Sequence, residues 1–222
     1  MQFVLLHSPL VGPASWARLA PLLRGRGHGV AVPDLTPLMA GEGPYYPALA
    51  EAAASAVSDN SILVVHSGAG ALVPAVAALA PLRGAIFVDA LLPHPGASWF
   101  AGVPEPLGAK LRGLVRTAGC RPWHAWWPKG AMEALLPDRA LGAAFMAEQG
   151  EVPLAYLDEV APAIIPLTTP SAYLQLSEAY REDADAAESE GWPVARLALS
   201  HLAMLTHADA VAEQVERLAG RL

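Results

Sequence analysis

Cysteine is almost absent from the sequence: Cys120 is the single one in 222 residues, so no disulfide can form within the chain. A chain without disulfides is typical of a reducing compartment, and we expect a cytoplasmic protein. No uninterrupted apolar run reaches the roughly 18 residues that a membrane-spanning helix needs, so we expect no membrane association. The apolar N-terminus, residues 1–6, has no basic region before it, and we interpret it as a strand rather than a signal peptide.

Positive charge is also scarce. The chain has 14 lysines and arginines against 21 aspartates and glutamates, which gives a formal net charge of -7. An acidic surface without a basic stripe repels phosphate backbones, so the composition argues against nucleic-acid binding. The sequence has no cluster of His, Cys, Asp and Glu with metal-ligand spacing and no Walker-type phosphate loop. We therefore expect no metal and no cofactor, and a small-molecule substrate as the partner.

What the sequence does have is a large apolar share, 54% of all residues, arranged in short runs. Apolar runs that predict buried strands alternate with segments of helical periodicity. The predicted strands are 2–6, 29–32, 61–65, 85–88, 172–176 and 194–199, and the last predicted helix is 208–218. This alternation predicts an α/β domain with about six mostly parallel strands and helices on both faces of the sheet.

The alternation stops between residues 92 and 170. This stretch is punctuated by proline and contains several tryptophans. An irregular insert between two strands of a parallel sheet is where a lid would lie. We therefore predict a helical lid at 92–170, inserted between the two parts of one core domain, residues 1–91 and 171–222.

The segment 62–70, Ile-Leu-Val-Val-His-Ser-Gly-Ala-Gly, is the most informative about chemistry. Its serine, Ser67, lies between the end of a predicted buried strand and the start of a helix, with only small residues after it. Such a tight turn holds the hydroxyl out at the carboxyl edge of the sheet. The free N–H groups at the start of the helix favour a developing oxyanion. These features predict Ser67 to be a nucleophile.

This segment resembles the nucleophile elbow of the α/β-hydrolase superfamily, with Val65 where those proteins have a small residue. Two further segments are similar to the superfamily. Residues 7–10, His-Ser-Pro-Leu, follow the first strand and resemble its oxyanion loop. His201 follows the last strand, where the superfamily places its catalytic histidine. The resemblance covers nearly the whole chain apart from the insert, and it implies a three-layer α/β-hydrolase fold.

The resemblance also implies a catalytic triad, in which His201 takes the proton of Ser67. Two acids compete for the third place. Asp89 ends the fourth strand, and Glu178 follows the fifth. Superfamily members use either place, but an acid at the start of a charged helix, such as Glu178, is already explained by the helix dipole. We therefore favour Asp89 and keep Glu178 as the alternative.

The N–H groups of Gly68 and Leu10 are the expected oxyanion donors, because Pro9 has no N–H. The aromatic insert should make the pocket apolar, so we expect hydrolysis of an ester, thioester or lactone of small to medium size. The residues that we expect to line the pocket are His7, Pro9, Trp99, His124, Trp126 and Trp127.

Three alternatives remain. A lyase could use the same serine and histidine as a proton shuttle without an acyl-enzyme, and an incomplete oxyanion hole would favour it. An inactive relative could only bind a ligand. The run Gly68-Ala69-Gly70, with Asp89 about 20 residues on, also matches part of a dinucleotide-binding fingerprint, but Val73 occupies its third glycine position.

Overall fold

The computed structural model describes residues 1–103, 105–116, 119–163 and 167–222; the rest, 104, 117–118 and 164–166, lie within the predicted lid and outside the described part. Its centre is a six-stranded sheet in the order β2-β1-β3-β4-β8-β9, with every neighbouring pair parallel. The strands are β1 (Gln2–Leu6), β2 (Gly29–Ala31), β3 (Ser61–Ser67), β4 (Gly84–Ala90), β8 (Ser171–Gln175) and β9 (Val194–Arg196). The predicted sheet of about six parallel strands is confirmed.

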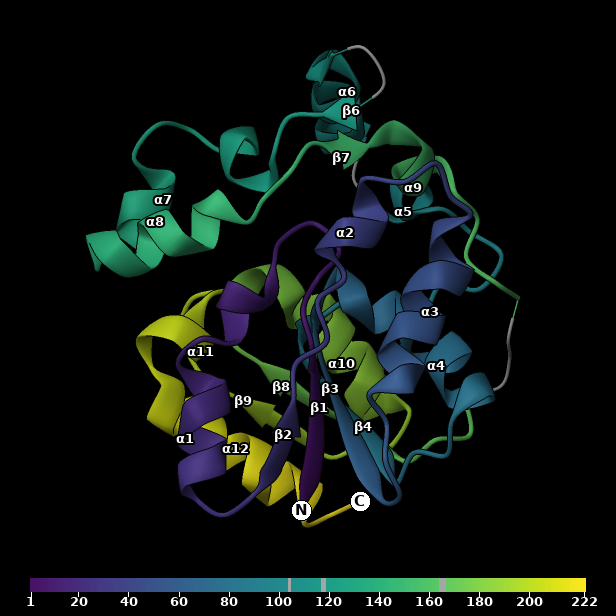
Figure 1. The fold of residues 1–222 in the computed structure, drawn as a ribbon, viewed down its shortest axis with the longest axis vertical. Coiled ribbons are helices and arrows are strands. Elements are labelled where there is room, and N and C mark those ends of the chain that lie inside the picture. The colour runs from purple at the N-terminus through teal and green to yellow at the C-terminus, as the bar shows by residue number, and fades with distance from the viewer. Residues whose placement is uncertain (104, 117–118, 164–166) are drawn as a thin grey trace.

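Helices cover both faces of this sheet (Figure 1). On one face α1 (Leu19–Gly25) packs against α12 (Ala208–Ala219), and on the other α3 (Tyr45–Ser55) packs against α4 (Val73–Leu79). Helix α10 (Arg181–Ser189) packs on β8 and β9. Because of this double cover, the central strands β3 and β4 are buried at every residue, which explains their continuous apolar runs.

The last strand is shorter than predicted. We expected 194–199, whereas β9 ends at Arg196. Its neighbour β8 ends at Gln175, so the residues after Arg196 have no strand beside them to pair with. The chain still follows β8 for a short distance, since Leu197 N–H donates to the carbonyl of Gln175 at 2.9 Å. The short helix α11 (Ala203–Thr206) then leads into α12.

The insert lies beyond the carboxyl ends of the strands, with α7 and α8 projecting to one side (Figure 1). It is not wholly helical, because β5, β6 and β7 form a small antiparallel sheet. Two-residue strands of this kind leave no periodic pattern in a sequence. The elements are α5 (Trp99–Gly102), α6 (Glu105–Gly113), β5 (Val115–Arg116), β6 (Gly119–Cys120), α7 (Ala131–Leu135), α8 (Arg139–Ala147), β7 (Val152–Pro153) and α9 (Leu154–Asp158). On the core side, α2 (Thr36–Met39) faces the insert.

Across the described ranges, none of the helices combines the length and the apolar character that crossing a membrane requires.

Candidate active site

Ser67 occupies a strained turn at the carboxyl end of β3. Its φ is 55°, in a region that side chains other than glycine rarely adopt, and the pairing of β3 with β4 shifts between His66 and Ser67. The turn is also tight: any side chain at Gly70 would collide with the carbonyl of Leu91. Leu91 N–H in turn donates to the carbonyl of Ser67 at 3.1 Å. Backbone strain of this kind costs about 1–3 kcal/mol and persists where the surroundings enforce it, often at functional sites.

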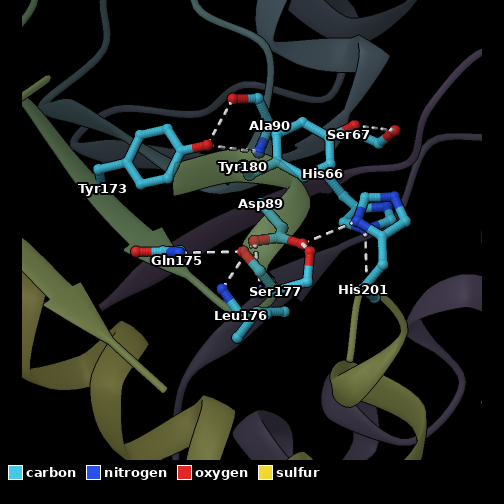
Figure 2. A network of polar contacts seen from close by, with 10 residues as sticks. All are labelled: His66, Ser67, Asp89, Ala90, Tyr173, Gln175, Leu176, Ser177, Tyr180 and His201. Atoms are coloured by element: carbon cyan, nitrogen blue, oxygen red, sulfur yellow. Dashed lines mark hydrogen bonds and ion pairs between the residues drawn. The ribbon is translucent and has the colours of Figure 1, made fainter. Parts of the chain in front are cut away.

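The buried Asp89 and the partly buried His201 form a pair beside this turn (Figure 2). The imidazole Nδ1 of His201 donates to Asp89 Oδ2 at 2.9 Å, and the Asp89 side chain is fully buried. The carboxylate also accepts from the backbone N–H of Leu176 at 2.7 Å and from Ser177, through its N–H at 3.0 Å and its hydroxyl at 2.5 Å. Burial alone would raise the pKa of Asp89, but the bonds from His201 and Ser177 outweigh it, and the pKa lies below its ordinary value. The carboxyl group is therefore ionised and fixed in direction.

Tyr173 of β8 holds the backbone at the end of β4. Its hydroxyl donates to the carbonyl of Ala90 at 2.7 Å and accepts from the N–H of Ala90 at 3.1 Å (Figure 2). The neighbouring Asp89 has φ 44°, a second positive value at a residue other than glycine. The clamp on Ala90 therefore helps to keep Asp89 in the backbone conformation that aims its carboxylate at His201.

The serine side of His201 is built differently. The Ser67 hydroxyl shares a hydrogen bond of 3.2 Å with the hydroxyl of Tyr180, and within the described ranges no hydrogen bond joins Ser67 to His201. The Tyr180 ring stacks on the imidazole of His201, with centroids 4.9 Å apart and an interplanar angle of 4°. Burial raises the pKa of the Tyr180 phenol, so it is neutral and can donate. Tyr180 thus contacts both the expected nucleophile and its expected base.

His66 supports His201 from the side of β3. The Nε2–H of His66 donates to the backbone carbonyl of His201 at 3.0 Å, and the two rings lie 4.4 Å apart. Burial, and then the neighbouring His201, hold the pKa of His66 well below its ordinary value, so His66 is neutral. His66, the residue before the serine, therefore fixes the loop that carries His201.

The loop after β1 approaches the serine turn. A Cβ atom on Gly68 would lie 3.1 Å from the hydroxyl oxygen of Ser8 and 3.9 Å from the ring of Pro9. Pro9 has no N–H, and the N–H of Leu10 already donates to Ser8 Oγ at 3.3 Å. The loop thus presents a serine hydroxyl beside Gly68, whereas the Leu10 N–H that we expected in the oxyanion hole is directed to that serine.

His7 fixes this loop rather than facing the serine. Its Nδ1–H donates to the carbonyl of Ser8 at 2.9 Å, and its Nε2 accepts from the N–H of Leu35 at 3.0 Å, so both ring nitrogens are engaged. The side chain is fully buried, and burial lowers its pKa. A neutral imidazole in a fixed tautomer therefore joins the loop after β1 to the start of α2.

The aromatic residues of the insert lie at different depths. Trp123 is the tryptophan beside the site, with its ring 6.3 Å from that of His201. Trp126 packs against Trp99 at 6.1 Å and donates its indole N–H to the carbonyl of Arg121. Trp127 is 39% exposed. His124 forms hydrogen bonds through its backbone N–H and its Nδ1 to the side-chain oxygen of Gln149. Of the residues that we expected to line the pocket, the structure places Pro9 beside the serine turn. Trp123, which was not among them, also lies near the site.

Glu178, the alternative acid, lies apart from His201. Its carboxylate pairs with Arg181 at 2.7 Å, and its side chain is 74% exposed. The structure thus brings Asp89 to the histidine and leaves Glu178 on the surface.

Sequence reasoning missed Ser177 and Tyr180. Both follow the carboxyl end of β8, at the edge of the sheet where ligands of parallel α/β proteins bind, so a search of every strand end would have found them. Trp123 belongs to the insert, where no sequence pattern indicates which side chains turn toward the core. Among the described residues, no group of His, Cys, Asp and Glu is arranged to hold a metal ion.

Comparison with known proteins shows similarity in structure and not in sequence. No protein-family profile matches the sequence, and no curated protein matches it. An extracellular α/β-hydrolase from a Paenibacillus species superposes with a TM-score of 0.78 at 19% identity, covering 98% of both chains. A pyrethroid hydrolase from Sphingobium faniae has a TM-score of 0.71 at 20% identity, covering 99% of this chain and 97% of its own. Tomato methylketone synthase I, solved with 2-tridecanone, has a TM-score of 0.72 at 17% identity, covering 99% and 98%.

These likenesses extend over nearly the full length of each chain, insert included. At such low identity these likenesses describe only the course of the backbone. Together with the six-stranded parallel sheet, they identify the fold. The chain has the α/β-hydrolase fold.

Proposed function

We propose that this protein is a serine hydrolase of carboxylic esters, thioesters or lactones, with Ser67, His201 and Asp89 as its triad. Ser67 Oγ attacks the acyl carbon while His201 takes its proton, and the C–O or C–S bond to the leaving group then breaks as His201 returns the proton to that group. Water, activated by His201, releases the acid and regenerates the serine. Asp89 stabilises the imidazolium throughout.

One observation carries this proposal: a fully buried carboxylate, Asp89, accepts a 2.9 Å hydrogen bond from Nδ1 of a histidine that lies beside a strained serine turn. A buried charge is costly unless it is paired, and here three further hydrogen bonds fix its direction. The ring of this histidine also stacks on Tyr180, which is hydrogen-bonded to Ser67. A purely structural role for Asp89 would not account for this link to the serine. If Asp89 instead bound the ribose of a dinucleotide, its hydrogen bond with His201 would have no explanation.

The bond between Ser67 and His201 would form when substrate displaces Tyr180 from the serine hydroxyl. Catalytic hydrogen bonds are often long or absent in ligand-free structures and form in the complex with substrate. In this step the Ser67 hydroxyl would exchange Tyr180 for His201 as its hydrogen-bond partner.

The substrate would be apolar. A cavity of about 420 Å³ lies between the loop after β1 and the insert. Its lining is largely apolar, with Pro9, Leu10, Met39 and Val152, and it also includes Glu148 and Glu151. This volume is within the range of small-molecule sites. Pro9 lines the cavity and also lies next to Gly68, which makes this cavity the candidate for the acyl group. We propose that residues 92–170 act as a lid on the core formed by 1–91 and 171–222, and that the acyl group occupies this cavity.

The test is covalent labelling with a fluorophosphonate probe, followed by the mass of the peptide that carries Ser67. We expect labelling of the wild type that is lost in Ser67→Ala and in His201→Ala. His207→Ala is the matched control, because His207 is an exposed histidine six residues further on that should not affect labelling. An unlabelled but folded wild type would rule out a reactive serine and with it the hydrolase.

A second candidate, a lyase that uses Ser67 and His201 as a proton shuttle, is favoured by one feature. The loop after β1 offers few N–H donors to an oxyanion, since Pro9 has none and Leu10 N–H is bonded to Ser8. Such an enzyme would cleave its substrate without forming an acyl-enzyme. Trapping an ester substrate's acyl group on Ser67 at low pH, detected by mass, would distinguish the two.

A further inference from the structure

Tyr156 of α9 reaches from the insert to the serine turn. Its hydroxyl would lie 3.9 Å from a Cβ atom placed on Gly68, the residue after the nucleophile. The side chain is only 1% exposed, and its hydroxyl makes no hydrogen bond to the described residues, although it is not one of the fully enclosed polar atoms there that lack a partner. A phenol hydroxyl that lies beside this turn and is not used by the described residues is available to a ligand there.

The ring of Tyr156 is held firmly in place. It packs edge-on against Tyr45 at 5.8 Å and lies 6.0 Å from Tyr46, both in the first turn of α3. Glu159, which follows α9, accepts hydrogen bonds from the backbone N–H groups of these two tyrosines, at 2.7 and 2.9 Å. The insert is thus fastened to the core next to Tyr156, and the position of the phenol is set before any substrate binds.

The environment also keeps the phenol protonated. Burial, together with the nearby Tyr46 and Glu159, raises the pKa of Tyr156 well above its ordinary value. A neutral hydroxyl in a dry setting is a strong donor to a developing negative charge, because little solvent competes for it. The same side of the turn holds the Ser8 hydroxyl, 3.1 Å from the same Cβ position on Gly68.

We propose that the Tyr156 hydroxyl is an oxyanion donor supplied by the insert, replacing the N–H that Pro9 lacks. This rests on the proposed acyl-transfer function. In the tetrahedral intermediate, the substrate's carbonyl oxygen gains a negative charge and accepts hydrogen bonds from the Gly68 N–H and the Tyr156 hydroxyl. The substrate class follows: an acyl compound with a carbonyl oxygen that can turn toward the insert.

The experiment compares Tyr156→Phe with Tyr45→Phe in hydrolysis of p-nitrophenyl butyrate. The two residues belong to one ring cluster, but the Tyr45 hydroxyl donates to the carbonyl of Gly41. Loss of one oxyanion donor lowers kcat by about 10²–10³-fold in well-studied hydrolases. We expect Tyr156→Phe to lower kcat by about 10²-fold with KM changed less than threefold, and Tyr45→Phe to change neither by more than threefold. Because the Tyr156 hydroxyl has no partner among the described residues, Tyr156→Phe should melt at or above the wild-type Tm.

Each other outcome overturns the inference. Equal kcat values for Tyr156→Phe and wild type would mean that the phenol does not touch the oxyanion. A rise in KM alone would assign Tyr156 to substrate binding, and a fall in Tm that parallels the loss of activity would make it structural. If the wild type shows no turnover that depends on Ser67, the proposed hydrolase itself fails, and that result is seen before any tyrosine variant is measured.

Discussion

The two sides of His201 differ in how completely they are fixed. On the acid side, Nδ1 donates to Asp89, which accepts three more hydrogen bonds from Leu176 and Ser177. On the serine side, no hydrogen bond connects His201 to Ser67 within the described ranges, and the serine hydroxyl is bonded to Tyr180. The acid side is therefore held by four hydrogen bonds to Asp89, whereas the proposed bond between Ser67 and His201 is not formed.

The difference follows from where each side comes from. Asp89, Leu176 and Ser177 lie at the ends of the adjacent strands β4 and β8, so the pairing of those strands sets their distances. The serine side depends instead on Tyr180, which lies in the turn after β8 and bonds Ser67 from outside the sheet. In the proposed mechanism, sheet geometry therefore orients His201, and the hydrogen bond from Tyr180 would control access to Ser67.

Breaking the acid side should have the largest effect. Asp89→Asn keeps the shape and the acceptor for Leu176 N–H but removes the charge and can force the wrong tautomer on His201. Because the equivalent change in a serine protease triad costs about 10⁴-fold in kcat, we expect a loss of about 10³–10⁴-fold in the rate of fluorophosphonate labelling. Labelling kinetics followed by intact mass would measure it.

The alternative acid provides the matched control for Asp89→Asn. Glu178→Gln removes a carboxylate that is exposed and paired with Arg181, so labelling should stay within twofold of the wild type. A large loss in Glu178→Gln together with a small one in Asp89→Asn would reverse the assignment of the acid.

Altering the serine side should have a smaller effect in the opposite direction. Tyr180→Phe keeps the ring on His201 but removes the hydrogen bond that holds Ser67 away from it. A net hydrogen bond contributes about 1 kcal/mol, so freeing the serine should raise the labelling rate about fivefold. Tyr180→Leu, which also removes the stacked ring, should lower it. A fall of tenfold or more in Tyr180→Phe would instead mean that the phenol assists the reaction.

The sequence predicted the parts of the site that depend on strand ends. Ser67, Asp89 and His201 each follow an apolar run, and parallel strands bring such positions to one edge of the sheet. The sheet itself was predictable for the same reason, since six apolar runs separated by helices permit few other arrangements.

The parts that the sequence did not predict depend on contacts between distant segments. Tyr156 reaches the serine turn because Glu159 fastens the insert to α3, more than a hundred residues away in the chain. The redirected N–H of Leu10 depends on one rotamer of Ser8. No periodicity or spacing encodes either contact.

The smallest expected effect is on the pH dependence of stability, through the protonation of Asp89. The pKa of Asp89 in the folded protein lies below its ordinary value of 3.8. As the pH falls, Asp89 is therefore protonated first in the unfolded chain, and this favours unfolding. Asp89 therefore contributes stability that is fully present above about pH 4 and is lost as the pH falls through the lowered pKa. Urea unfolding of the wild type and of Asp89→Asn between pH 6 and pH 2.5 should show their difference in unfolding free energy shrinking only below about pH 4. Asp183, whose pKa is raised by burial, titrates in both proteins and largely cancels in the comparison. A difference that stays constant down to pH 2.5 would mean that the hydrogen bonds to Asp89 stabilise its neutral form as well as its charged one, and the acid side would then be no better adapted to a carboxylate than to an amide.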